Sequence, residues 1–256
     1  MRVALTGGAT GIGAAVAEKL MSAGHEVVAF DISEPSQPVT QWVQTDLSDP
    51  TSIASALESA TGSFDALINN AGLPPREGLE LTILQVNYFG MRAFLTGMLD
   101  KLNPGASIVN TASRAGAMWR DNLDEVKALM ALDPQDLSDF IASRSMDATR
   151  AYNLSKEAVI VLTMAQTEAM IQRGLRMNSV SPAAVSTGIL DDFTKAFGPK
   201  VAKNIARAGR PGTPEEIADI ILFLASPQSA WIKGQDITID GGMSAMGMTD
   251  MMGLPR

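Results

Sequence analysis

The first thirty residues contain the feature that most constrains the fold. A short apolar run at residues 3–5 leads into a glycine-rich turn at residues 6–13, and apolar residues at helical spacing follow as far as Leu20. A strand, a glycine turn and a helix in this order let a phosphate approach the backbone and meet the free N–H groups of the helix N-terminus. The sequence therefore predicts a phosphate-binding loop; for the glycines alone, an ordinary tight turn is the alternative.

A second apolar run, at residues 26–31, ends in the acidic residue Asp31, 18 positions after Gly13. A carboxylate at this point can accept hydrogen bonds from the ribose hydroxyls of NAD, and it would repel the 2′-phosphate of NADP. Together with the glycine turn, Asp31 predicts a dinucleotide site that prefers NAD(H) to NADP(H).

The rest of the chain alternates strand patterns with helical ones. Strands are predicted at residues 44–47, 64–69, 107–113, 176–182 and 235–240, and one long helix is predicted through residues 86–102. A capping box at residues 213–216 begins another helix. This alternation predicts an α/β fold: a single Rossmann-type doubly wound domain over residues 1–256, with about seven mostly parallel strands and helices on both faces.

Composition excludes several functional classes. The chain of 256 residues is 46% hydrophobic and 19% charged, so we expect a folded protein with a substantial core. It has no cysteine and one histidine, which excludes disulfides and thiolate catalysis and leaves no metal site to be expected. The net charge of −8 disfavours binding to nucleic acid and to anionic membranes. No apolar run approaches the roughly 18 residues of a spanning helix, so we expect a cytoplasmic location.

Tyr152 and Lys156 lie four residues apart in a segment whose apolar residues predict a helix. This spacing places both side chains on one helix face. A cation held near a phenol favours the phenolate and lowers the tyrosine pKa, which makes Tyr152 a candidate general acid/base. The alternative is an amphipathic helix with a tyrosine at the edge of the core and a solvated lysine.

The motifs in combination resemble those of short-chain dehydrogenases/reductases, and the resemblance covers almost the whole chain. The matching motifs are Thr6-Gly7-x-x-x-Gly11-x-Gly13, Asn69-Asn70-Ala71-Gly72 and Tyr152-x-x-x-Lys156. The resemblance implies an oxidoreductase that interconverts a secondary alcohol and its ketone or carbonyl with NAD(H), with Tyr152 as the general acid/base. It also implies a small hydrophobic alcohol or ketone as the substrate.

The resemblance further implies individual roles. Ser113 would position the substrate oxygen, Lys156 would lower the pKa of Tyr152 and bind the nicotinamide ribose, and Asn87 would support a proton relay. The implied catalytic residues are Asn87, Ser113, Tyr152 and Lys156. The residues implied in cofactor binding are Gly7, Thr10, Gly11, Ile12, Gly13, Asp31, Asp46, Leu47, Asn70, Ala71, Gly72, Tyr152, Lys156, Pro182, Val185 and Thr187.

Two features depart from the usual family pattern. Ser113 and Tyr152 are 39 positions apart, and the additional residues at about 117–150 resemble an insertion of the bacterial 3α-hydroxysteroid dehydrogenase/carbonyl reductase branch. We expect a homodimer or homotetramer and hypothesise that the insertion alters its subunit interface; a surface elaboration without a role is the alternative. Ala183 stands where the family usually has glycine, which would restrict the loop after the strand at residues 176–182.

Two segments are expected to form the walls of a substrate pocket. A lid is predicted at residues 188–207, whose apolar side chains either cover a hydrophobic substrate or belong to the core. The methionines near the C-terminus line the cleft or a subunit interface, or belong to a disordered end. Neither segment has a motif that identifies the substrate, so steroid, aromatic and alicyclic alcohols all remain open. A catalytically silent NAD(H)-binding sensor on the same fold is a further alternative.

Overall fold

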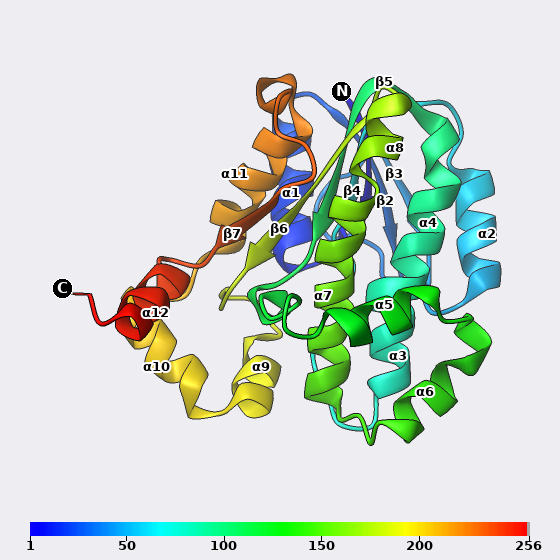
Figure 1. Cartoon of the computed structure of the whole chain (residues 1–256). Coiled ribbons are helices and arrows are strands. Elements are labelled where there is room, and N and C mark those ends of the chain that lie inside the picture. The colour runs from blue at the N-terminus through cyan, green and yellow to red at the C-terminus, as the bar shows by residue number, and fades with distance from the viewer. Residues whose placement is uncertain (255–256) are drawn as a thin grey trace.

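The computed structural model describes residues 1–254, so Pro255 and Arg256, which the single-domain prediction also included, lie outside the described residues. Its centre is one sheet in the order β3-β2-β1-β4-β5-β6-β7, in which every neighbouring pair is parallel (Figure 1). The strands are β1 Arg2–Thr6, β2 Glu26–Asp31, β3 Gln41–Gln44, β4 Phe64–Asn69, β5 Leu102–Thr111, β6 Arg176–Pro182 and β7 Asp236–Ile239. The predicted doubly wound sheet of seven strands is confirmed.

The sheet has its apolar cores on both faces because side chains alternate along each strand. In β1, Val3 and Leu5 pack with α1 and α11 on one face, whereas Ala4 belongs to the core that contains α2, α4 and α7 on the other. The helices are α1 Gly11–Ser22, α2 Pro50–Ser59, α3 Glu80–Leu84, α4 Met91–Met98, α5 Leu123–Ala131, α6 Leu137–Ser143, α7 Ala148–Ala165, α8 Thr167–Gln172, α9 Leu190–Phe197, α10 Pro199–Ala208, α11 Pro214–Ala225 and α12 Met243–Met252.

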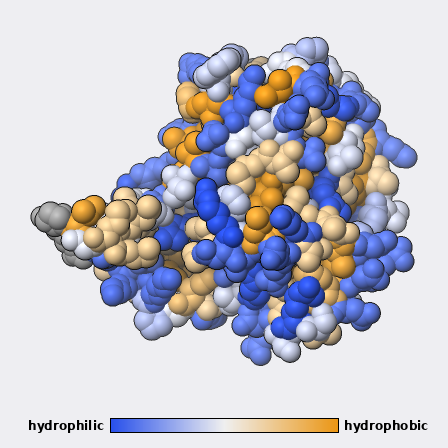
Figure 2. Space-filling model, in the orientation of Figure 1, coloured by the Kyte–Doolittle hydropathy of each residue, from blue (hydrophilic) through white to orange (hydrophobic). Residues whose placement is uncertain are grey.

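The strand order changes direction between β1 and β4. The chain passes outward from β1 through β2 to β3 and then returns to pair β4 with the other side of β1. Such a switch point leaves a crevice outside the carboxyl ends of the strands, where ligands bind in open α/β sheets. The helices α9, α10 and α12 lie beyond this edge, and α12 projects from the body of the molecule (Figures 1 and 2).

Two predicted boundaries are wrong. The third strand is β3, residues 41–44, and not residues 44–47, because Trp42 and Val43 pair with β2 while the Asp46 carboxylate accepts the Ser48 N–H and turns the chain toward α2. The fifth strand begins at Leu102 and not at residue 107. Phe64 of β4 already pairs with Leu102, and a shift in register separates this pair from the regular pairing that starts at Ala66 and Ser107.

The long helix predicted through residues 86–102 is present, but it begins at Glu80, ends at Lys101 and is not uniformly α-helical. The segment consists of α3, a π-helical turn (η1, Gln85–Gly90), α4 and a 3₁₀ turn (η2, Leu99–Lys101). A Cβ atom at Gly90 would lie 1.9 Å from the carbonyl oxygen of Leu47, so the wide turn brings this helix against the loop after β3. Such π turns are frequent at functional sites.

The insertion is held on α7 by a network of charges around the buried carboxylate of Glu157. It contains α5, a 3₁₀ turn (η4, Pro134–Asp136) and α6. Arg150 of α7 donates to Glu157 at 2.7 and 3.0 Å and to Glu125 of α5 at 2.8 and 3.0 Å. The amide of Asn122 donates to Glu157 at 2.7 Å, and the Glu157 side chain is only 1% exposed. The ion pair between Arg150 and Glu157 on the helix that carries Tyr152 is therefore also bonded to the insertion.

Among residues 1–254, no helix has both the length and the apolar character that crossing a membrane requires.

We predict that Arg150→Met lowers the free energy of unfolding by about 3 kcal/mol, because it leaves the buried Glu157 carboxylate without its cation. Replacing both partners, as in Arg150→Met with Glu157→Leu, should recover much of this loss. Arg173→Met is the matched control: Arg173 pairs with the exposed Asp100, so its loss should cost no more than about 1 kcal/mol. Urea unfolding followed by circular dichroism measures all of these variants. Equal tolerance of the two arginine variants would contradict the prediction.

Candidate active site

A cavity of about 1200 Å³ opens at the carboxyl ends of the strands. Its walls come from the loops after β1, β2, β3, β4, β5 and β6, from α7, from the segment 188–204 and from α12. Of the site residues predicted from the sequence, all except Gly13 and Asn87 line this cavity. Residues far apart in the sequence therefore meet at the edge where the switch point lies.

Glycine is required where the loop after β1 meets the loop after β4. Gly7 has a φ of +69°, and a Cβ atom there would lie 2.6 Å from the Cα atom of Ala71. A Cβ atom at Gly13 would lie 1.8 Å from the carbonyl oxygen of Gly7. Gly13 is thus a packing residue behind the loop. Thr10, the N-cap of α1, makes no side-chain capping bond, so the first-turn N–H groups are available to an anion.

Asp31, at the end of β2, is fixed beside this loop. Its Oδ2 atom accepts the Ala9 N–H at 2.9 Å and its Oδ1 atom accepts the Ser33 N–H at 3.0 Å. Two backbone donors orient the carboxylate, and each oxygen keeps further acceptor capacity toward the cavity. The loop geometry and this acid therefore fit the diphosphate and ribose of a dinucleotide.

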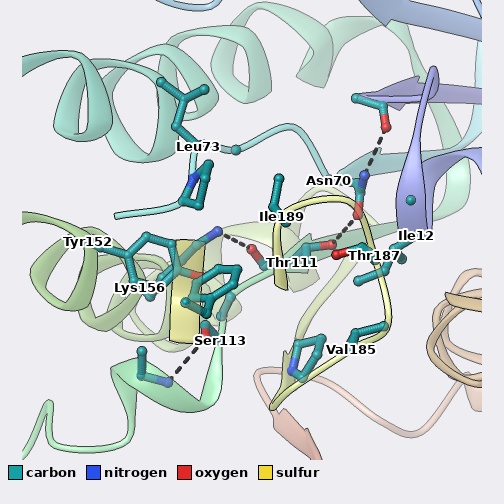
Figure 3. Close-up of a pocket in the computed structure, with 18 of the residues that line it drawn as sticks. Ile12, Asn70, Leu73, Thr111, Ser113, Tyr152, Lys156, Val185, Thr187 and Ile189 are labelled. Atoms are coloured by element: carbon teal, nitrogen blue, oxygen red, sulfur yellow. Dashed lines mark hydrogen bonds between the residues drawn. The ribbon is translucent and has the colours of Figure 1, made fainter. Parts of the chain in front are cut away.

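Asn70 connects the two loops to β5. Its Nδ2 atom donates to the carbonyl oxygen of Gly7 at 2.9 Å, and its Oδ1 atom accepts the Thr111 hydroxyl at 3.3 Å (Figure 3). On the facing side of the cavity, Val185 and Thr187 follow β6, and Thr187 would be the nearest neighbour of a Cβ atom at Gly11, at 3.4 Å. Both sides of the expected dinucleotide site are thereby built from residues that touch the glycine loop.

Ser113, two residues beyond β5, is the N-cap of a 3₁₀ turn (η3, Arg114–Gly116), and its Oγ atom accepts the Ala115 N–H at 3.1 Å. Gly116 lies against the α7 backbone: a Cβ atom there would be 2.8 Å from the carbonyl carbon of Lys156 and 2.9 Å from the nitrogen of Glu157. The turn after Ser113 is therefore in direct contact with the helix that carries Tyr152. Figure 3 shows Ser113, Tyr152 and Lys156 gathered on one side of the cavity.

Burial dominates the electrostatics of this group. Tyr152 and Lys156 are each 5% exposed, and Lys156 donates to the carbonyl oxygen of Thr111 at 2.9 Å. Burial raises the pKa of Tyr152 to about 12, although a hydrogen bond with the Ser113 side chain acts in the opposite direction. Burial also lowers the pKa of Lys156 to about 8. The expected lowering of the Tyr152 pKa is thus wrong for this structure, because removing the phenolate from water outweighs a cation 5.8 Å from the ring centre.

Asn87 lies in the π turn η1, one layer behind the cavity wall. Its Oδ1 atom accepts the Leu73 N–H at 2.7 Å, and its Nδ2 atom donates to the carbonyl oxygen of Leu73 at 3.0 Å and to Ser155 Oγ at 3.3 Å. A Cβ atom at Gly72 would lie 3.1 Å from Asn87 Oδ1 and 3.4 Å from Lys156 Nζ. Asn87 therefore fixes the loop beside Lys156 with its side chain.

The wider part of the cavity is apolar and aromatic. Phe193 of α9 meets the Tyr152 ring edge-to-face with centroids 5.3 Å apart, and Phe197 stacks on Phe193 at 6.3 Å. Both line the cavity, as do Met243 and Met251 of α12. Two phenylalanines of α9 and two of the C-terminal methionines thus contribute to the cavity wall. Lys200, within the predicted lid, also lines it; Met118 and Arg114 line it too and were not predicted, because neither belongs to a known motif.

Ion pairs connect these wall segments to their neighbours. Arg76, in the loop after β4, pairs with Asp192 of α9 at 2.9 Å, and Arg207 of α10 pairs with Asp250 of α12 at 2.8 Å. Ala183 does not have a positive φ, because Ser145 is the sole non-glycine residue with one in the described part of the chain. The loop after β6 therefore does not require glycine at this position.

Comparison with known proteins agrees with this geometry. Residues 2–123 match a family model described as short chain dehydrogenase, and residues 136–244 match one described as enoyl-(acyl carrier protein) reductase. The coniferyl-alcohol dehydrogenase of Pseudomonas sp. (strain HR199) is 33% identical, over 95% of this chain and 96% of that protein. The 3-alpha-hydroxysteroid dehydrogenase/carbonyl reductase of Comamonas testosteroni is 30% identical, with coverage of 95% and 96%.

A solved structure gives the same result. The 3-alpha-hydroxysteroid dehydrogenase from Pseudomonas sp. B-0831, crystallised with NADH, superposes with a TM-score of 0.85 at 31% identity and covers 96% of this chain and 98% of its own. The sheet order, the motifs around the cavity and this likeness along nearly the whole sequence lead to one conclusion: the chain is an oxidoreductase of the short-chain dehydrogenase/reductase family.

Proposed function

We propose that the protein interconverts a secondary alcohol and its ketone by NAD(H)-dependent hydride transfer. The observation that carries this proposal is that Ser113, Tyr152 and Lys156 line one cavity together with the glycine loop and Asp31. The relatives support it, because they are named as alcohol and hydroxysteroid dehydrogenases and the solved neighbour was crystallised with NADH.

The nucleotide end of the cavity supports the cofactor assignment. The loop at Gly7 and Gly11 allows a diphosphate to approach the backbone and the α1 N-terminus, and Asp31 would accept the ribose hydroxyls. Asp46, Leu47, Ala71 and Gly72 would border the adenosine part, and Pro182, Val185 and Thr187 the nicotinamide part. When bound, the nicotinamide would accept or supply the hydride.

Tyr152 is proposed as the proton-transfer residue. In oxidation its phenolate takes the hydroxyl proton of the alcohol, and in reduction its phenol donates a proton to the carbonyl oxygen. The Ser113 hydroxyl, hydrogen-bonded with Tyr152, would hold the same substrate oxygen. Lys156 favours the phenolate while it carries its charge, and Asn87 keeps the adjoining loop in place.

The walls favour an alcohol with a ring system. Phe193, Phe197 and Met243 offer flat and adaptable apolar contacts next to Tyr152. Steroid, aryl and alicyclic alcohols all have such a body, and the relatives include proteins named as a coniferyl-alcohol dehydrogenase and a 3-alpha-hydroxysteroid dehydrogenase/carbonyl reductase.

For the assembly, we propose a homodimer or homotetramer whose interface is altered by the insertion. The support is that α5 is attached to α7 through Glu125 and Arg150, so this part of the α7 surface is covered within the subunit. Light scattering of the purified protein and crosslinking between α7 residues of two subunits test this arrangement. Efficient crosslinking of α7 to α7 would contradict it.

We predict that Tyr152→Phe reduces kcat for alcohol oxidation by about 100-fold or more, because the proton has no acceptor. Its dissociation constant for NADH should stay within about twofold of the wild-type value. The chain contains one other tyrosine, and Tyr88→Phe is the matched control: Tyr88 is buried away from the cavity, so activity should be retained. Assays of NADH formation with steroid, aryl and alicyclic secondary alcohols, and fluorescence titration of NADH, provide the measurements.

The same experiment tests the sensor alternative. If NADH binds but no alcohol or ketone in the panel turns over with either cofactor, a silent NAD(H)-binding protein becomes the better explanation. A Tyr152→Phe variant that retains more than about a tenth of the activity would refute the proposed role of this residue.

For cofactor choice, we predict that kcat/KM with NAD exceeds that with NADP, and that Asp31→Asn lowers this ratio by about tenfold or more. The neutral amide keeps an acceptor for one of the two loop N–H groups and removes the charge that repels a 2′-phosphate. Asp46→Asn is the matched control, because Asp46 lines the same end of the cavity but its carboxylate is engaged by Ser48. An unchanged NAD/NADP ratio in Asp31→Asn would argue against the proposed preference.

For pH dependence, oxidation requires the phenolate of Tyr152, whose pKa burial raises to about 12. The phenolate fraction, and with it kcat/KM for oxidation, should therefore increase by up to about tenfold per pH unit above about pH 7. The increase should flatten above about pH 8, where Lys156 loses the charge that favours the phenolate. Carbonyl reduction uses the protonated phenol, so its rate should stay nearly level. Profiles in both directions at constant ionic strength check this; oxidation that slows as pH increases from 7 to 8 contradicts it.

A further inference from the structure

The charges around the cavity are distributed unequally. Its nucleotide end contains the carboxylates Asp31 and Asp46. In the described part of the chain, no other Asp or Glu lines the cavity. The remaining charged residues of its wall are the cations Arg114, Lys156 and Lys200. This local excess of positive charge opposes the net charge of −8 of the whole chain. An anionic group in this end of the cavity would meet no carboxylate of the wall.

Arg114 is the better placed of the two cations that the proposed chemistry does not use. It follows Ser113 directly, and its side chain is 35% exposed. Its Nε atom lies 3.5 Å from Asp240 Oδ2 but has no hydrogen-bond partner, and its two terminal nitrogens make no hydrogen bond within residues 1–254. The edge of the guanidinium, whose in-plane N–H groups could bind a carboxylate bidentately, is therefore unused.

A purely structural role explains this geometry poorly. Asp240 already accepts the N–H groups of Gly242 at 3.0 Å and Ser244 at 2.7 Å at the start of α12. Arg150 shows what a structural arginine looks like in this protein, because it makes four hydrogen bonds to two carboxylates. Arg114 is oriented by Asp240 on one side and keeps the rest of its donors free in the cavity.

Resting on the proposed function, we propose that the substrate is a hydroxy acid: a ring-containing secondary alcohol with a carboxylate remote from the carbinol, which Arg114 binds. The ring lies against Phe193 and Phe197, the carbinol oxygen reaches Ser113 and Tyr152, and the carboxylate pairs with the free donors of Arg114. Lys200, on α10, adds a second positive charge at the wall. The class includes hydroxyalkyl benzoates and other cyclic hydroxy acids.

The test compares substrates that differ in one charge. Meta- and para-(1-hydroxyethyl)benzoate are assayed beside their methyl esters and 1-phenylethanol. We expect kcat/KM for one of the acids to exceed that for its ester by about tenfold or more, because a charge-assisted hydrogen-bonded pair contributes at least this factor. The preference should weaken with added salt.

Variants identify the residue. Arg114→Gln should abolish most of the preference for the acid and leave kcat/KM for the ester within about twofold, whereas Arg114→Lys should retain part of it because the charge remains. Lys200→Gln should have a smaller effect in the same direction. Lys203→Gln is the matched control, since Lys203 is an exposed residue of the same helix outside the cavity wall.

Several outcomes would overturn the proposal. Wild-type protein that does not distinguish acids from esters contradicts it, and so does an Arg114→Gln variant that loses activity toward both equally, which indicates that Arg114 positions Ser113. An Arg114→Gln variant whose defect is a weaker affinity for NAD would assign the cation to the cofactor phosphates instead.

A binding measurement separates this proposal from the proposed function. The complex of Tyr152→Phe with NADH is titrated with meta- and para-acetylbenzoate and with their methyl esters by calorimetry. If an acid binds more tightly than its ester to Tyr152→Phe, but not to the double variant Tyr152→Phe with Arg114→Gln, the carboxylate site is supported even if turnover is absent. Turnover of neutral alcohols without any preference for the acids in either assay refutes the carboxylate site and leaves the dehydrogenase proposal intact.

Discussion

The close contact between Gly116 and the backbone of α7 is the constraint on which the geometry of the cavity depends. Ser113 reaches the site from β5, whereas Tyr152 and Lys156 reach it from a helix that follows the whole insertion. Since a Cβ atom at Gly116 would be 2.8 Å from a backbone carbon of α7, no other residue allows the two elements to come this close. The 3₁₀ turn that contains Gly116 begins at Ser113, and the Ala115 N–H of this turn donates to the Ser113 hydroxyl. The contact at Gly116 therefore also fixes where Ser113 lies relative to α7. On the far side, Arg150 and Glu157 hold the insertion on the same helix through their bonds to Glu125 and Asn122.

Burial of Tyr152 and Lys156 determines the acid–base chemistry of the site. Tyr152 and Lys156 lose water together, so the protein opposes charge on both, and the phenol is neutral at neutral pH. Their reactivity is therefore not a property of the pair alone. It depends on what enters the cavity, because a positive charge or a hydrogen-bond donor near the phenol oxygen shifts the balance toward the phenolate. Proton transfer is in this way coupled to occupancy of the site.

Much of the fold could be predicted from the sequence because its signals are local. The glycine turn, Asp31 and the apolar runs of the buried strands each identify themselves within a few residues. The π turn at Asn87 could not be predicted, since it is stabilised by hydrogen bonds to Leu73, fourteen residues earlier, and by the approach of Gly90 to Leu47. The shifted Tyr152 pKa and the position of Arg114 depend likewise on how separate segments enclose a volume, and no pattern along the chain expresses this.

The walls of the wide end of the cavity have an evolutionary consequence. They come from the start of the insertion, from α9 and α10, and from α12, none of which contributes a hydrogen bond to the sheet. The residues proposed for proton transfer and cofactor binding are mostly fixed by the strand ends and by α7. Substitutions in the walls can thus change which molecule fits at little expense in folding stability, while the reaction itself is preserved. A lineage with this architecture is free to acquire new substrates by drift in three peripheral segments.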